Sequence, residues 1–224
     1  MRGDRTPPKA LSFNPEKPFR FIAEHPSIDF VNTVDWTERG LEHERITSYE
    51  RFIEWSEAAA IVGGTDAQRL RRRARASSRR AARAHQSALW TRWVLQRLFV
   101  SVATQTSDRT AVREFNQLLG DALARTVVAE PSARGTRRAS EAKPFARSWD
   151  GMGEELASPL WPLLWRASTL VTSEDVALLR ICASEDCGWL YLDRSRNGWR
   201  RWCDMATCGT QEKNRRRTQA GGER

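Results

Sequence analysis

The chain has 224 residues, 40% of them hydrophobic and ten of them tryptophan, which is enough to bury a core of its own. Lysine and arginine exceed aspartate and glutamate by nine, and a surplus of this sign suits a polyanionic partner. No stretch reaches the roughly 18 apolar residues that a transmembrane helix needs, and residues 1–17 lack the apolar segment of a secretion signal. These features argue against a membrane or secreted protein, and we expect a location in the cytoplasm.

The first part of the chain predicts a tail, a strand and two helices. Residues 1–18 are expected to form a disordered tail, and residues 19–22 alternate in the way of a short strand. A proline at the first helical position, followed by apolar residues, predicts a helix over 26–33. A capping box at Thr47, with a glutamate three residues later, starts a second helix that the glycine pair 63–64 should end.

The middle of the chain predicts more helices and one pair of strands. Apolar residues at helical spacing indicate a long helix over 77–105, followed by a helix that Ser107 caps. Two strands are expected at 126–129 and 145–149, on either side of the polar loop 131–142. Two further helix starts are marked by a serine, at Ser158 and Ser173.

One run of the body is unusually basic. From Arg69 to Arg83 there are eight arginines and no acidic residue. Arginine can pack its aliphatic part on an apolar surface while the guanidinium stays in water, so an ordinary solvated helix face explains the run. The alternative is a row of phosphate contacts beside the C-terminal part of the chain.

The four cysteines of the chain all lie within 27 positions, as C-x4-C-x15-C-x4-C: Cys182, Cys187, Cys203 and Cys208. Two close pairs, joined by a spacer long enough to fold back, can offer four thiolates to one tetrahedral ion. We therefore predict one structural Zn2+ in a closed site, whose loss should unfold the finger and leave the body folded. The alternative is two disulfides, which need an oxidising compartment that the N-terminal sequence does not indicate.

Basic residues surround the second pair of cysteines. Residues 190–192 are compatible with a strand, Asn197-Gly198 is a hairpin-turn signal, and Asp204 can cap a helix that ends near residue 217. Arginines lie on both the turn and this helix, which favours contact with nucleic-acid phosphates. The predicted contact residues are Arg194, Arg196, Arg200, Arg201, Lys213, Arg215, Arg216 and Arg217.

Two parts of the chain resemble known domains. The run Cys-Gly-Trp-Leu-Tyr-Leu-Asp-x-Ser-Arg-Asn and the later Arg-Arg-Trp-Cys-Asp-Met-Ala-Thr-Cys-Gly, both within residues 182–209, resemble the CGNR zinc finger. The run His-Pro-Ser-Ile-Asp-Phe-Val-Asn-Thr at 25–33 is similar to the start of the ABATE domain. The resemblance implies a bacterial, stress-related transcription regulator that binds DNA through its zinc finger. For the N-terminal domain we expect a sensor role.

The chain departs from that family in the motif that names the finger. Cys208-Gly209-Thr210-Gln211 stands where the family has Cys-Gly-Asn-Arg. The zinc ligand and the glycine are retained, and an arginine that could contact phosphate or guanine is replaced. Because a glutamine can still pair with adenine or bond a phosphate, Gln211 is counted among the predicted nucleic-acid contacts.

These patterns together predict an α+β fold: a mostly α-helical body with a small antiparallel sheet, plus a C-terminal zinc ribbon. The expected domains are an ABATE-like helical domain over 19–177, a four-cysteine zinc finger over 178–217 and a second disordered tail over 218–224. Within the body, three short polar residues are candidates for a ligand pocket: Asp29, Asn32 and Thr33. The alternative for them is that polar residues near a helix start bond the local backbone.

The predicted function is a zinc-binding transcription regulator with DNA as its partner. We do not expect an enzyme, because the sequence has no P-loop, nucleophile elbow or dinucleotide-binding motif. Two alternatives stay open for the same finger. One is a protein–protein adaptor that docks through an exposed tryptophan, and the other is an RNA-binding protein that stacks bases on its aromatic residues.

Overall fold

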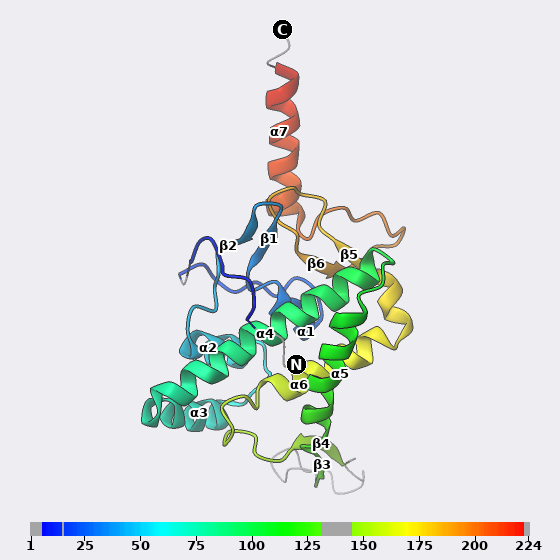
Figure 1. The fold of residues 1–224 in the computed structure, drawn as a ribbon. Coiled ribbons are helices and arrows are strands. Elements are labelled where there is room, and N and C mark those ends of the chain that lie inside the picture. Colours follow the sequence, from blue (N-terminus) through cyan, green and yellow to red (C-terminus); the bar gives the residue numbers. More distant parts are fainter. Residues whose placement is uncertain (1–5, 15, 131–144, 222–224) are drawn as a thin grey trace, which may run out of the picture.

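The computed structural model describes residues 6–14, 16–130 and 145–221. It confirms the predicted α+β fold, a helical body with small antiparallel sheets, from which the last helix projects (Figure 1). None of the described helices is both long enough and apolar enough to cross a membrane. The elements in chain order are α1 (Pro26–Val31), β1 (Asp35–Thr37), β2 (Gly40–Glu42), α2 (Tyr49–Ala58), α3 (Gly64–Ala76), α4 (Ser78–Ala103), α5 (Arg109–Leu123), β3 (Thr126–Ala129), β4 (Ala146–Trp149), α6 (Leu160–Val171), the 3-10 helix η1 (Glu174–Leu178), β5 (Leu179–Ile181), β6 (Leu190–Leu192), the π-helical turn η2 (Met205–Gly209) and α7 (Thr210–Gly221).

The core of the body forms around α4, which packs against α1, α2, α3, α5 and α6. Aromatic rings fill its centre, where Phe30 lies 5.9 Å from the Phe52 ring and 5.1 Å from the Trp55 ring, centroid to centroid. The same core includes Leu190 and Leu192 from β6, whose strand lies between the second and third cysteines of the chain. The sheet that carries the zinc finger is therefore built into the hydrophobic core of the body.

Several helix boundaries differ from those predicted. α6 begins at Leu160 with Pro159, and not Ser158, at its N-cap. Ser48, and not Thr47, accepts the backbone N–H at the start of α2, and Asp108, and not Ser107, does so for α5. The glycines at 63–64 begin α3 instead of ending α2. Thr47 and Ser107 each have a neighbour that is as good an N-cap residue, so residue type alone does not select between them.

The N-terminal segment is more ordered than predicted. The backbone N–H of Leu11 donates to the Leu41 carbonyl at 2.7 Å, and that of Asn14 donates to the Glu44 carbonyl at 2.9 Å. These bonds hold part of the predicted tail against β2. Residues 19–22, predicted as a strand, have no regular secondary structure and belong to no sheet among the described residues.

The C-terminal part also differs from the prediction. The turn at Asn197-Gly198 is present, but its arms do not form the predicted hairpin: β6 pairs antiparallel with β5 instead. After the turn, backbone groups bond to side chains, as when the N–H of Arg200 donates to Asp193 Oδ2 at 3.1 Å. The predicted tail over 218–224 is helical as far as Gly221, where α7 ends. The predicted polar loop 131–142 lies outside the described residues.

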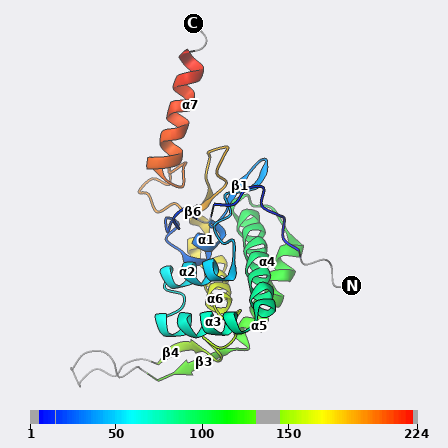
Figure 2. The same ribbon diagram turned by 90° about the vertical axis from the view of Figure 1, so that its left-hand side faces the viewer.

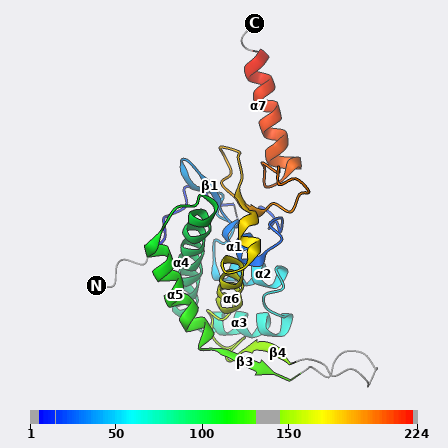
Figure 3. The ribbon, with the colours of Figure 1, turned by 90° about the vertical axis from the view of Figure 1, so that its right-hand side faces the viewer.

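The arginine run 69–83 follows α3 and the start of α4, at the end of the molecule away from α7 in all three views (Figures 1, 2 and 3). Arg71 pairs with Glu50 at 2.6 Å and with Glu57 at 3.0 Å. The run is thus a solvated helix face that neutralises neighbouring carboxylates, and the alternative of a basic row beside the finger is wrong.

Candidate metal centre

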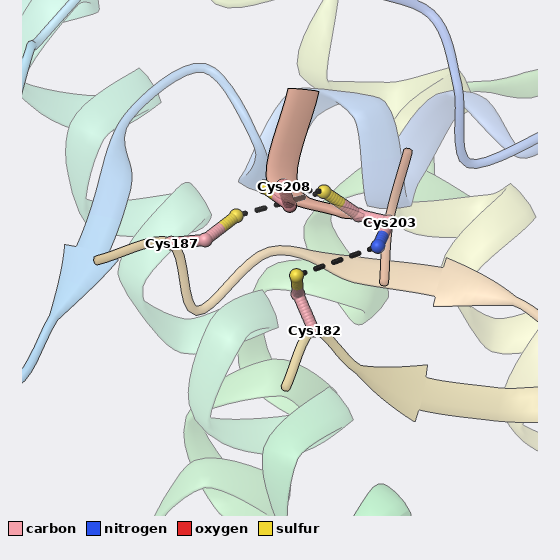
Figure 4. A group of neighbouring side chains, drawn as sticks. All are labelled: Cys182, Cys187, Cys203 and Cys208. Atoms are coloured by element: carbon pink, nitrogen blue, oxygen red, sulfur yellow. Dashed lines mark hydrogen bonds between the residues drawn. The ribbon is translucent and has the colours of Figure 1, made fainter. Parts of the chain in front are cut away.

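The four cysteines converge on one buried point between the β5–β6 sheet and the base of α7 (Figure 4). All four Sγ atoms lie within 4.8 Å of one another, and Cys203 Sγ lies 3.6 Å from both Cys187 Sγ and Cys208 Sγ. A tetrahedral zinc with Zn–S bonds of about 2.3 Å places its sulfurs about 3.8 Å apart. The cysteines are free thiols, and these distances exceed the disulfide length of about 2.05 Å. The geometry fits a closed, four-thiolate zinc site.

Local backbone structure positions each thiol. Cys182 follows β5, where its N–H donates to the Trp189 carbonyl at 2.7 Å, and Cys187 lies on the turn before β6. Cys203 precedes Asp204, whose side chain accepts the N–H of Ala206 at 3.0 Å and so caps the helical turn η2. Cys208 lies within that turn, near the positive end of the helix that follows, and this location favours a thiolate.

The thiols control one another's ionisation. Hydrogen bonds from Cys187, Cys203 and Cys208 hold the pKa of Cys182 well below its usual range. The same contacts, together with burial, raise the pKa of Cys187 well above it. Cys182 acts to raise the pKa of Cys208, but hydrogen bonds from Cys187 and Cys203 lower it to about 7, while contact with Cys182 raises the pKa of Cys203. The four thiols therefore cannot all ionise without a cation between them. Binding of Zn2+ supplies that cation and releases the protons.

The segment from the end of α1 to β1 holds the finger against the body. Part of what it contacts is the turn 184–187, here called the cysteine turn, which ends at Cys187. The Asn32 side chain bonds both backbone groups of Leu190, donating from Nδ2 to its carbonyl at 2.8 Å and accepting its N–H on Oδ1 at 3.0 Å. The backbone N–H of Trp36 donates to the Cys187 carbonyl at 3.0 Å. Asn32 thus makes the two backbone hydrogen bonds to β6 that a neighbouring strand would otherwise make. The bond from Trp36 fixes the finger to the body at a metal ligand, Cys187.

A buried ion pair supports the same junction. Trp189 Nε1 donates to Asp35 Oδ1 at 2.9 Å, and Arg45 Nη2 donates to the same oxygen at 2.8 Å. The Arg45 guanidinium also lies over the Trp189 ring, 5.1 Å from its centroid. Sequence reasoning missed Asp35 and Arg45, because nothing in their local sequence distinguishes them from surface charges. The only signal is that charged residues are buried almost exclusively as pairs.

Gly188 allows the closest approach in this junction. Its φ is +63°, a conformation that favours glycine, and a Cβ at this position would lie 2.0 Å from the Trp36 carbonyl oxygen. Any side chain here would push the cysteine turn away from the body. The close contact with Trp36 therefore explains why a glycine stands between Cys187 and Trp189.

The residues predicted to line a ligand pocket are all used by the fold. Asp29 accepts the backbone N–H groups of Ile22 and Ala23, both at 3.0 Å. Thr33 Oγ1 accepts from Arg92 Nη1 at 2.8 Å, and Asn32 holds β6 as described. None of the three lines the cavity of about 650 Å³ that opens between body and finger. Asp29 bonds the local backbone, as the alternative expects, and Thr33 also donates to the Phe30 carbonyl at 2.8 Å, whereas Asn32 bonds a strand 158 residues away. The ligand role stays a prediction.

The Asp29 contacts lead to a test by pH. Burial raises the pKa of Asp29 from 3.8 to about 6, against the lowering effect of the two backbone N–H groups. A carboxyl whose pKa rises on folding stabilises the fold when protonated, so this contribution is lost as the pH rises from about 4 to above 6. We expect Asp29→Asn, which keeps the acceptor oxygen without the charge, to gain about 3 kcal/mol relative to wild type across that range.

Urea unfolding of both chains at several pH values within that range measures this difference. Comparison with wild type is needed because His25, whose pKa is lowered to about 4 by burial and by Arg166, acts in the opposite sense in both chains. A difference in unfolding free energy that stays constant with pH would show that Asp29 is ionised throughout.

The predicted nucleic-acid residues fall into three groups. Exposed side chains without an acidic partner among the described residues are Arg196, Arg201, Lys213 and Arg217, and Gln211 is exposed as well. Arg194 pairs with Asp175 at 2.7 Å, and Arg215 pairs with Glu185 and Glu212. Arg200 has a structural role, since its guanidinium bonds the carbonyls of Trp202 and Cys203. The side chain of Arg216 lies outside the described part of the structure.

Comparison with known families agrees with this architecture. A model of the CGNR zinc finger matches residues 179–219, which contain the four cysteines. A model named ABATE, described as a "putative stress-induced transcription regulator", matches residues 24–174, well over half of the chain. No curated protein matches the chain. The zinc site is therefore the metal centre of a CGNR zinc finger, and the chain belongs to the ABATE family.

Proposed function

We propose that this protein regulates transcription in the bacterial cytoplasm by binding DNA through its zinc finger, without catalysing a reaction. The observation that carries the proposal is α7, a helix that stands away from the rest of the molecule in all three views (Figures 1, 2 and 3). Its exposed cations Lys213 and Arg217 have no acidic partner among the described residues.

The composition of α7 indicates the kind of partner. The helix is polar on every side, so it has no apolar stripe with which to pack on a protein surface. Its diameter of about 10–12 Å matches the major groove of B-DNA, which is about 12 Å wide. Its second turn is anchored through Arg215, which pairs with Glu185 between the first two cysteines. The zinc site therefore fixes the direction in which the basic helix leaves the body.

The body supplies the proposed sensor. Asn32 and Asp35 bond Leu190 and Trp189 of the finger directly, so a signal that displaces the segment from the end of α1 to β1 would reach the finger without an intermediate element. Displacement of this segment would change the contact between body and finger, and with it the affinity of the finger for DNA. No rearrangement outside the junction is required.

Salt dependence of binding tests the proposal. Affinity of the zinc-loaded chain for a duplex should fall linearly with log salt, with a slope of about −0.9 per phosphate neutralised. The double variant Lys213→Ala, Arg217→Ala should flatten this slope by up to about 1.8 and weaken all sequences alike. The matched control is Arg72→Ala, Arg75→Ala, which removes two exposed charges from α3 at the other end of the molecule. The control should leave the slope unchanged.

A second variant tests the departure from the family motif. Thr210→Asn with Gln211→Arg restores the replaced arginine, and we expect it to strengthen duplex binding, since a bidentate contact contributes about 1–3 kcal/mol. If neither wild type nor this variant retards DNA at about 50 mM salt with zinc bound, the DNA-binding proposal is wrong and a protein partner is favoured.

A further inference from the structure

We propose that the loop 194–201 is a stacking platform for an unpaired base, and that the finger binds single-stranded or locally opened DNA more tightly than intact duplex. This inference rests on the proposed DNA binding and adds a second contact element to α7. The residue that would stack is Trp199.

The three tryptophans of the finger have different environments. Trp189 is 3% exposed and Trp202 is packed against the cysteine cluster, but Trp199 is 80% exposed. An indole is the largest apolar side chain, and leaving it in water forfeits most of its burial free energy. Because Trp199 contributes so little to the core, its exposure indicates a contact surface.

The loop holds Trp199 in place before any partner binds. Asp193 closes it from one side, accepting the N–H of Ser195 on Oδ1 at 3.0 Å and the N–H of Arg200 on Oδ2 at 3.1 Å. The Arg200 guanidinium lies over the Tyr191 ring at 4.5 Å and bonds the Trp202 carbonyl at 3.1 Å. Both ends of the loop are thus fixed, and little ordering entropy remains to be lost when a ligand stacks on the indole.

The charges around the indole favour nucleic acid over protein. Arg196 and Arg201 are exposed, and neither has an acidic partner in the described part of the chain. The two nearest carboxylates in sequence, Asp204 and Asp193, are both engaged: Asp204 pairs with Arg20, and Asp193 is buried and bonds the loop backbone. An aromatic anchor for a protein partner normally lies among other apolar groups, whereas the loop offers only polar and charged neighbours. An exposed aromatic face flanked by guanidiniums that no carboxylate neutralises is the arrangement that binds unstacked bases and their phosphates.

The zinc site relates this platform to α7. The loop ends two residues before Cys203, and α7 begins two residues after Cys208, so two ligands of one metal separate the two elements. With the metal bound, the loop and α7 are therefore both attached to the same metal centre.

Three DNAs of the same length and sequence test the inference: a duplex, a duplex with a central bubble of unpaired nucleotides, and the single strand. The zinc-loaded full chain should bind the bubble and the single strand more tightly than the duplex. Trp199→Ala should weaken binding to those two by about 5- to 150-fold and leave duplex binding nearly unchanged. Trp199→Phe, which keeps a stacking face, should retain most of the affinity. Because the side chain is exposed, zinc content and thermal stability should be the same in all three proteins.

The outcomes separate this inference from the function on which it rests. If wild type binds the three DNAs equally and Trp199→Ala changes nothing, the stacking platform is wrong and DNA binding through α7 stands. Equal weakening on all three DNAs would also contradict base stacking. No binding to any of them overturns both proposals. Tighter binding of the matching RNA strand than of the DNA strand would overturn the assignment to DNA.

Discussion

Cys203→Ser is expected to release the zinc and to lower the stability of the whole chain. A structural zinc contributes about 10–16 kcal/mol to folding in small modules, which is as large as the entire unfolding free energy of an ordinary domain. The sequence alone suggests that the body would stay folded. The structure changes this expectation, because Leu190 and Leu192, between the ligands, belong to the core of the body. Metal content and thermal unfolding followed by circular dichroism measure the effect.

The matched control for this variant is Ser184→Ala. It removes a side-chain oxygen from the same cysteine turn and leaves all four ligands in place. The control should keep its zinc and melt with wild type. A Cys203→Ser protein that has lost its metal but still melts at the wild-type temperature would show that the body folds independently of the finger.

Gly188→Ala is expected to have the second large effect, and Gly198→Ala is its control. Both glycines have nearly the same left-handed conformation, with φ of +63° and +65°. A Cβ at Gly188 would meet the Trp36 carbonyl oxygen at 2.0 Å, whereas a Cβ at Gly198 would meet no described atom within 4 Å. We therefore expect Gly198→Ala to cost about 1–2 kcal/mol from backbone conformation alone, and Gly188→Ala to cost about 2–5 kcal/mol.

The difference between the two variants isolates the close approach of the finger to the body. Chemical denaturation of both zinc-loaded proteins measures it. In Gly188→Ala the bond from the Trp36 N–H to the Cys187 carbonyl should also be lost, which faster amide exchange at Trp36 would report. Equal destabilisation by the two substitutions would mean that the junction can open without cost.

The parts of the fold that local sequence controls were predictable. Periodic apolar residues located α4 to within two residues at each end, and β3 and β4 lie at or within one residue of the expected positions. The cysteine spacing located the metal site, because a four-thiolate centre imposes its own pattern on the sequence. At these elements the local sequence pattern determines the structure, and no contact with a distant part of the chain overrides it.

The junction between body and finger was not predictable, because it joins segments about 155 residues apart. Local sequence only places Asn32 near a helix start, and its bonds to Leu190 depend on how the whole body folds. The hairpin at Asn197-Gly198 failed for a related reason. The turn signal was correct, but β6 found a better partner in β5, and Asp193 took the backbone groups beyond the turn.

Metal and thiol content together test the central claim, that one zinc holds the four cysteines of a finger built into the body. Protein purified under reducing conditions should contain one zinc per chain. Its four thiols should become reactive only after chelation, because all four are buried around the ion. A metal-free chain that carries two disulfides would contradict the account.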